Sequence, residues 1–129
     1  MGGALALLDA VLFRMLLGPT TEIRTVLYGM SRVGNEQFVN FVDALLPASV
    51  KNIVNMNDPY PVTPSLALGF HGVAGEIHIQ DSDGKWIVCP GDDNADPRCI
   101  AGTVTSLNDA NFSNHIGPYD SITISCTGS

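Results

Sequence analysis

The sequence predicts an α/β fold with parallel strand pairing, because helical and strand patterns alternate through its first half. Residues 1–17 carry apolar side chains at helical spacing, and residues 23–28 form a β-branched run of strand length. An amphipathic helix at residues 35–46 and a second strand at 50–56 follow. Helix, strand, helix and strand in this order indicate parallel strands joined by helical crossovers. From Leu68 onward the pattern changes to short strands and polar loops within the same fold.

Length and composition suit one domain and exclude some partners. A chain of 129 residues buries roughly two thirds of the surface that it exposes when unfolded. Hydrophobic residues make up 45% and the mean hydropathy is +0.19, so we expect some apolar surface to contact a neighbour. The net charge is −7, and six Lys and Arg residues occur singly. Because no basic patch is present to neutralise phosphates or anionic headgroups, we expect no nucleic acid among its partners.

The first seventeen residues predict a helix that is buried nearly all round. Its large apolar residues fill more than one face: Leu5, Leu7, Leu8, Val11, Leu12, Met15 and Leu16. Asp9 and Arg14 interrupt the run, which is too short for a transmembrane span and lacks the basic start of a signal peptide. Gly2 and Gly3 let the first turn approach a neighbouring strand closely, as in the strand-turn-helix of a serine hydrolase.

The next elements have recognisable boundaries. Gly18 and Pro19 end the first helix, and residues 23–28 predict a buried parallel strand. Asn35 is placed to cap the second helix, and Pro47 follows its end. The strand at 50–56 leads into the Asp58-Pro59 pair.

The second half predicts a hairpin and polar loops. Residues 76–80 alternate between polar and apolar side chains, residues 86–88 are apolar, and Asp83-Gly84 between them predicts the turn. The acidic loops at 81–84 and 91–94 do not complete a calcium-binding pattern, so we interpret them as solvated turns and expect no metal site. Asn111-Phe112-Ser113 is a glycosylation acceptor in a secreted chain.

Two residues suit acyl transfer, which needs a nucleophile, an imidazole and a carboxylate. Asp58 follows a predicted parallel strand, where open α/β sheets place functional residues. The alternative is that Asp58 only begins an Asp-Pro turn. His115 lies near the chain end, as the order Ser, Asp, His requires. His71 and His78 lie in strand-like stretches and are interpreted as structural.

Four segments resemble the class 3 (fungal-type) lipases. Residues 1–6 are similar to the run that follows Gly-His-Ser in that family, and residues 28–35 to its Tyr-Gly-x-Pro-Arg-Val-Gly-Asn run, with Ser31 in place of proline. We assign no chemistry to the second run. Residues 58–61 are similar to the Asp-x-Val-Pro stretch of the catalytic aspartate, with Tyr60 in place of valine. Residues 115–120 are similar to the catalytic His-x-Gly-Pro-Tyr segment.

The resemblance implies a secreted α/β-hydrolase that acts on acylglycerols at a lipid-water interface without a cofactor. Residues 1–129 are then the C-terminal part of one hydrolase domain, with Asp58 and His115 as catalytic residues. The nucleophilic serine precedes Met1, whose N–H is the remaining oxyanion donor, and a signal peptide belongs to the missing part. Substrate side groups lie near Val62, Pro64, Leu66 and Ile116.

The same reading implies that this chain alone is inactive and folds poorly, since the strand at 23–28 exposes an edge. Two alternatives remain open. A phenolic-acid (feruloyl-type) esterase uses the same machinery. In a non-catalytic extracellular binding module, the Asp58 and His115 segments are inherited scaffold, and the loops from 91 to 114 bind a ligand.

The three cysteines indicate one disulfide. Cys89 and Cys99 flank a short loop whose closure stabilises by roughly 3 kcal/mol. Cys126 is left over, and we expect it to pair with a cysteine in the missing N-terminal part. Three reduced, buried thiols are the alternative.

Overall fold

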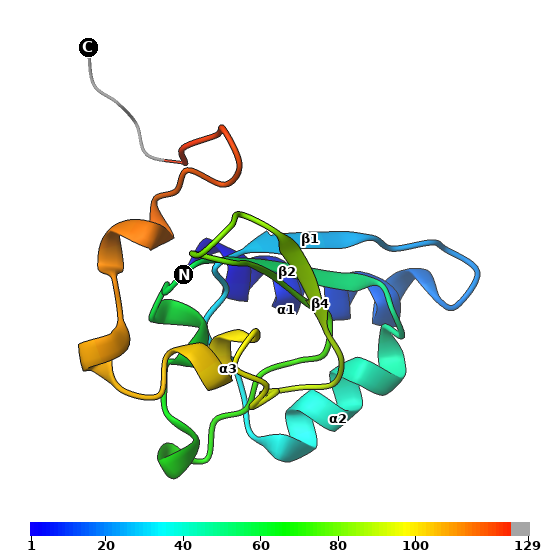
Figure 1. Cartoon of the computed structure of the whole chain (residues 1–129). Helices are drawn as coiled ribbons and strands as arrows, with labels where there is room; N and C mark the ends of the chain where they lie inside the picture. The colour runs from blue at the N-terminus through cyan, green and yellow to red at the C-terminus, as the bar shows by residue number, and fades with distance from the viewer. Residues whose placement is uncertain (125–129) are drawn as a thin grey trace.

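A mixed four-stranded sheet forms the centre of the protein in a computed structural model that describes residues 1–124 (Figure 1). Its strands are β1 (Thr25–Tyr28), β2 (Val50–Asn55), β3 (Glu76–Ile79) and β4 (Trp86–Cys89), in that spatial order. β1 and β2 pair in parallel, as do β2 and β3, whereas β4 runs antiparallel to β3. The predicted α/β fold is confirmed.

Helices flank the sheet and form the larger of its cores. They are α1 (Gly2–Leu17), α2 (Glu36–Leu45) and the short α3 (Ile100–Thr103). α1 packs against β1 and touches α2. The Asn35 side chain accepts the Phe38 N–H at 3.0 Å, so the predicted cap of α2 is confirmed. The core between these helices and the sheet consists of Leu7, Ala10, Val11, Leu27, Met30, Val39, Val42, Leu46, Val50 and Val73.

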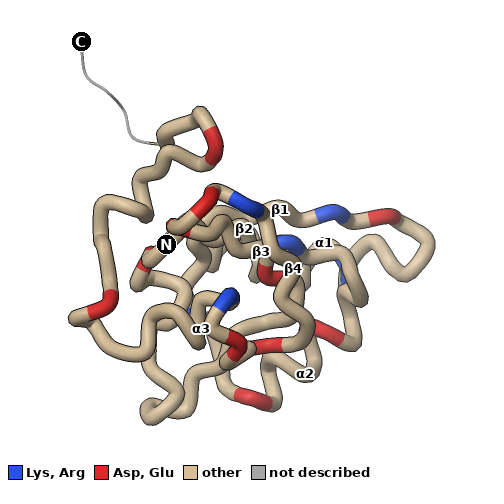
Figure 2. The backbone as a smooth tube through the Cα atoms, viewed as in Figure 1, with Lys and Arg blue, Asp and Glu red and all other residues tan. Residues whose placement is uncertain are grey.

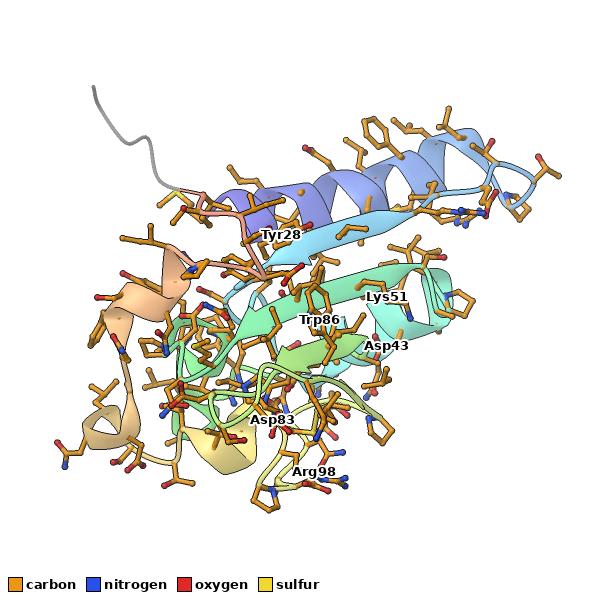
Figure 3. All side chains as sticks on the ribbon, turned by 45° about the horizontal axis from the view of Figure 1, so that its top comes forward. Tyr28, Asp43, Lys51, Asp83, Trp86 and Arg98 are labelled. Carbon is orange, nitrogen blue, oxygen red and sulfur yellow. A yellow bond between two sulfur atoms is a disulfide. The ribbon has the colours of Figure 1, made fainter. Side chains whose placement is uncertain are left out.

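The prediction that the first helix is buried nearly all round is wrong for the described residues. Only Leu7, Ala10 and Val11 of α1 are buried. Most of its other large side chains are about half exposed or more, and Figure 3 shows them projecting away from the sheet. The reason is geometric, because α1 contacts β1 and α2 on one side, and residues 1–124 supply nothing that covers its outer face.

The sheet edge next to α1 is also open within residues 1–124. β1 begins at Thr25, two residues later than predicted, and pairs only with β2. Val26 and Tyr28 on this strand are 55% and 44% exposed. An apolar helix face therefore adjoins an unpaired strand edge.

The predicted hairpin and disulfide fasten the other side of the sheet. The Gln80 N–H donates to the Lys85 carbonyl at 2.9 Å, which closes the turn between β3 and β4. The Cys89–Cys99 disulfide joins the end of β4 to the residue before α3 and confirms that pairing. Cys126 lies outside the described residues, so its pairing stays a prediction.

Four 3₁₀ turns complete the second half of the fold as far as residue 124. They are η1 (Tyr60–Val62), η2 (Leu66–Leu68), η3 (Leu107–Asp109) and η4 (Phe112–His115). Lys and Arg residues occur singly along the backbone and form no cluster in the part of the chain that the structure describes (Figure 2). Among the described helices, none is long and apolar enough to cross a membrane.

We expect removal of the disulfide to destabilise the second half of the fold. Replacing Cys89 and Cys99 together by serine should lower the free energy of unfolding by roughly 3 kcal/mol, because the unfolded chain then regains the freedom of a ten-residue loop. Urea unfolding followed by tryptophan fluorescence at Trp86, beside the hairpin, measures this loss. Equal midpoints for the two proteins would contradict the assignment.

Glu76 should make stability depend on pH. Burial raises the pKa of its carboxyl above the ordinary value of 4.5, although the Ile100 N–H donates to it at 2.8 Å. A raised native pKa means that the folded chain holds the proton longer, so the stabilisation present below about pH 4.5 is lost as the pH rises through the native value. The difference in melting temperature between Glu76→Gln and the unchanged protein should therefore move in favour of the variant between pH 4 and 7. A difference that stays constant over that interval would argue against this account.

Candidate active site

Asp58 and His115 form a hydrogen-bonded pair although 57 residues separate them in the chain. Oδ2 of Asp58 lies 2.8 Å from Nδ1 of His115, and Oδ1 accepts the Tyr60 N–H at 2.9 Å. The Asp58 side chain is fully buried, whereas that of His115 is 26% exposed. Because an ionised carboxylate only accepts hydrogen bonds, Nδ1 carries the ring proton. Nε2 is then the nitrogen available to accept a proton.

Burial changes the pKa of the Asp58 carboxyl. Desolvation raises its pKa, and the hydrogen bonds from His115 and the Tyr60 N–H oppose this rise. A desolvated carboxylate attracts a neighbouring cation more strongly than one in water. The pair is therefore suited to stabilise a positive charge that forms on His115.

Side-chain amides from the end of β2 hold the histidine segment in place. Nδ2 of Asn55, a fully buried side chain, donates to the Asn114 carbonyl at 2.9 Å. The Asn57 carbonyl accepts the Asn111 N–H at 2.9 Å, and Nδ2 of Asn57 donates to the Asp109 carbonyl. Sequence reasoning missed both asparagines, whose one signal was their position beside Asp58.

Gly29, the residue after β1, lies directly against the Asp58–His115 pair. A Cβ atom built on it would be 2.6 Å from Oδ2 of Asp58 and 2.7 Å from Nδ1 of His115. Its φ of +55° also disfavours any other residue. We assigned no chemistry to residues 28–35 from the sequence, yet Gly29 provides the space in which the pair forms.

The first turn of α1 lies at the same edge of the sheet. A Cβ on Gly3 would lie 3.1 Å from Cβ of Met30, the residue after Gly29. Met1 precedes the helix and is 94% exposed. Gly3, two residues after the predicted oxyanion residue Met1, thus packs beside Met30, whose neighbour Gly29 lies against the Asp58–His115 pair.

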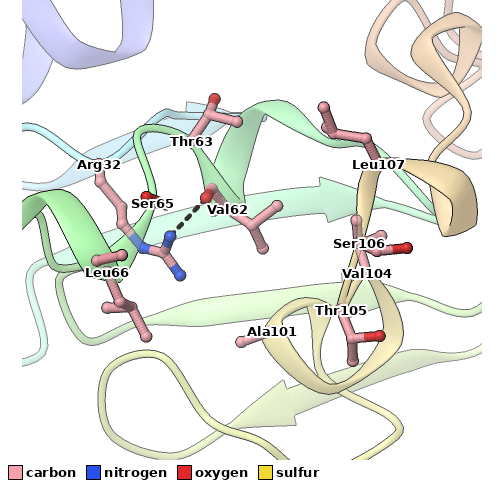
Figure 4. Close-up of a pocket in the computed structure, with 11 residues that line it drawn as sticks. Arg32, Val62, Thr63, Ser65, Leu66, Ala101, Val104, Thr105, Ser106 and Leu107 are labelled. Atoms are coloured by element: carbon pink, nitrogen blue, oxygen red, sulfur yellow. Dashed lines mark hydrogen bonds between the residues drawn. The ribbon is translucent and has the colours of Figure 1, made fainter.

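A buried ion pair shapes the loop after Asp58. Arg32 binds Asp93 with a separation of 2.6 Å between Nη2 and Oδ1 and donates to the Pro64 carbonyl. It also donates to the Val62 carbonyl, as Figure 4 shows. Asp93 also accepts the Gly72 N–H at 2.8 Å. The side chain of Asp93 is only 13% exposed, and it neutralises the buried Arg32. The interpretation of residues 91–94 as solvated turns is therefore wrong for Asp93.

Two of the predicted substrate residues line a pocket of about 500 Å³. Val62 and Leu66 form one wall, and the segment from Ala101 to Leu107 faces them (Figure 4). Pro64 contributes its carbonyl to Arg32, and Ile116 is 45% exposed beside His115 without lining this pocket.

The other histidines have different surroundings. The His78 ring is buried, and its nitrogens lie 2.7 Å from the Arg98 carbonyl and 2.6 Å from the Met56 carbonyl, which gives it a structural role. His71 comes close to Asp92 and Asp93. Asp93 is already paired with Arg32, and we assign this cluster no functional role.

Comparison with known proteins finds one matching family model and several similar sequences. The family model described as Lipase (class 3) matches residues 1–68. Secreted mono- and diacylglycerol lipase MDL2 from Malassezia globosa is 32% identical, and the match covers 74% of this chain and 30% of the relative. Secreted mono- and diacylglycerol lipase 2 from Gibberella zeae is 33% identical, with 83% and 29% covered. The chain thus spans about 30% of the length of these relatives.

Solved structures share the fold. The Rhizomucor miehei lipase in its propeptide complex has a TM-score of 0.78 and 28% identity, and the match covers 98% of this chain and 40% of that one. Lip2 lipase from Yarrowia lipolytica has a TM-score of 0.76 and 24% identity, with 92% and 44% covered. The second likeness concerns the fold alone.

Adding a methyl group at Gly29 should separate Asp58 from His115. Gly29→Ala places the new carbon against both side chains, so we expect a stability loss of about 3 kcal/mol or more and disappearance of the downfield Nδ1 proton resonance of His115. Gly69→Ala is the matched control, because Gly69 has a φ of +79° and open space around its Cβ position. That control should lose only about 1 kcal/mol and keep the resonance. A retained resonance in Gly29→Ala would refute the close approach.

Proposed function

The chain belongs to the class 3 lipase family, and on that premise we propose that it supplies the aspartate and histidine of a serine-type carboxylic ester hydrolase. The hydrogen bond between Asp58 and Nδ1 of His115 carries this proposal. It orients the ring, fixes the tautomer and leaves Nε2 free to act as a base.

Each residue of the pair has a defined task in the proposed reaction. Nε2 of His115 takes the proton from a serine hydroxyl while the serine oxygen forms a bond to the ester carbonyl carbon. Asp58 stabilises the resulting imidazolium. The imidazolium then gives its proton to the leaving alcohol. In the second half, Nε2 takes a proton from water while the water oxygen attacks the acyl carbon, and the imidazolium returns that proton to the serine oxygen as the fatty acid leaves.

We propose that the serine directly precedes Met1 in a longer form of this polypeptide. Within residues 1–124, no hydroxyl or thiol donates a hydrogen bond to Nε2 of His115. The start of α1 is a suitable place for the nucleophile, because Gly3 packs against Met30 and the neighbouring Gly29 touches the Asp58–His115 pair. The Met1 N–H and the positive end of the α1 dipole would then stabilise the oxyanion.

Acylglycerols are the proposed substrates, and the proposed location is extracellular. Relatives whose names describe secreted mono- and diacylglycerol lipases support both statements. The pocket beside η1 suits an acyl chain, because its volume falls in the usual range for small-molecule sites and its walls are mainly apolar. We propose Val62 and Leu66 as contacts of that chain, and Pro64 and Ile116 as neighbouring contacts. The Cys89–Cys99 disulfide is compatible with an oxidising compartment.

The decisive experiment begins upstream of the Met1 codon. We expect in-frame codons for Gly-His-Ser, and the extended protein should hydrolyse short-chain acylglycerols. His115→Ala should then reduce turnover roughly a million-fold and Asp58→Ala roughly ten-thousand-fold. Asp81→Ala, which alters an exposed aspartate in the hairpin, is the matched control and should keep full activity.

The shorter chain provides the opposing test. Residues 1–129 should hydrolyse neither acylglycerols nor phenolic-acid esters. Ester hydrolysis by this chain that is lost in His115→Ala would overturn the proposed position of the nucleophile. Preference of the extended protein for feruloyl esters would overturn the acylglycerol assignment.

A further inference from the structure

The Tyr60 ring lies against the ring of His115. The two ring centroids are 4.1 Å apart, and the planes are inclined by 38°. Phe112 packs at right angles to Tyr60, with centroids 6.1 Å apart. Tyr60 is anchored from behind, because its N–H donates to Oδ1 of Asp58. One short turn thus places a carboxylate at the edge of the imidazole and an aromatic ring over its face.

An aromatic face attracts cations within about 6 Å of its centre, because its π electrons form a negative surface. A neutral imidazole gains little from this attraction, whereas an imidazolium gains more. The distance between Tyr60 and His115 lies inside that range. The contact therefore favours the protonated ring, which is the form that Asp58 also stabilises.

We propose that Tyr60 is a positioning residue that stabilises the imidazolium form of His115 through the face of its ring. The inference rests on the proposed function, in which that imidazolium forms during turnover. The side chain is 40% exposed, so burial in the core does not account for an aromatic residue here. The family pattern has valine at this position, and valine offers shape without a π face.

Of the other groups that we place near the His115 ring, Asp58 is the one that carries a charge. Asp58 approaches from the loop after β2 and is the charged group that hydrogen-bonds the ring. The Tyr119 hydroxyl, from the segment after η4, donates to the His115 carbonyl rather than to the ring. Burial raises the pKa of that hydroxyl, so it stays neutral. Tyr28, at the end of β1, packs on Tyr119.

Histidine titration by NMR tests the proposal directly. The Cε1–H resonance of His115 is followed against pH in the unchanged chain, in Tyr60→Val and in Tyr60→Phe. Tyr60→Val should lower the titration midpoint by about half a pH unit, a roughly threefold change in the protonation equilibrium. Tyr60→Phe keeps the π face and should stay within about 0.2 units of the unchanged chain.

Two outcomes would overturn the proposal. One is an unchanged midpoint in Tyr60→Val. The other is an equal decrease in Tyr60→Phe, which would assign the effect to the hydroxyl. The buried His78 ring, held by two carbonyls, reports on the fold, and its resonances should coincide in all three proteins. If residues 1–129 aggregate, the same titration on the extended protein gives the answer.

The titration needs no nucleophile. If Tyr60→Val does not change the His115 midpoint, the proposal for Tyr60 is refuted and the proposed hydrolase function still stands. Conversely, an extended protein without esterase activity would leave the effect of Tyr60 on His115 measurable. In an active extended protein, the acid limb of the kcat/KM profile should move to lower pH in Tyr60→Val and remain in place in Tyr60→Phe.

Discussion

A fully buried carboxylate at the end of β2 is the constraint on which the site depends. A buried charge is unfavourable unless donors surround it, and Asp58 has two, the Tyr60 N–H and Nδ1 of His115. The first donor requires the chain to turn immediately after β2, which produces η1. The second requires a segment 57 residues away to return to the same edge of the sheet. The site is thus a consequence of satisfying one carboxylate.

The ion pair between Arg32 and Asp93 holds the other end of the same loop, beside the pocket. Arg32 leaves the segment after β1, binds Asp93 from the second half of the chain and holds two carbonyls of the loop that follows η1. Removing one partner of such a pair would leave a buried charge unpaired, which is strongly destabilising. The loop from Tyr60 to Pro64 is therefore fixed at one end by Asp58 and at the other by Arg32. Proton transfer and the pocket share one rigid segment.

Local signals in the sequence predicted local structure well. The Asn35 cap, the Asp83-Gly84 turn and the short Cys89–Cys99 loop each depend on residues close together in the chain, and all three were confirmed. Pairing across the fold was harder to predict. Asp93 was misinterpreted because its partner is 61 residues away, and Gly29 carried no sign that two side chains would converge on it. The Asp58 and His115 assignments relied on resemblance because spacing alone left an Asp-Pro turn equally reasonable.

The error on the first helix follows from the same distinction. A run of apolar residues such as Leu5, Phe13 and Leu16 indicates that a helix face favours burial, but it does not indicate which residues cover that face. In residues 1–124 the covered part of α1 is the part that meets β1 and α2. The uncovered part adjoins the free edge of β1, so one element that paired with β1 would also pack on α1. Covering the apolar face of α1 and pairing the edge of β1 are therefore one packing problem, which a single strand with its helix-facing side chains would solve.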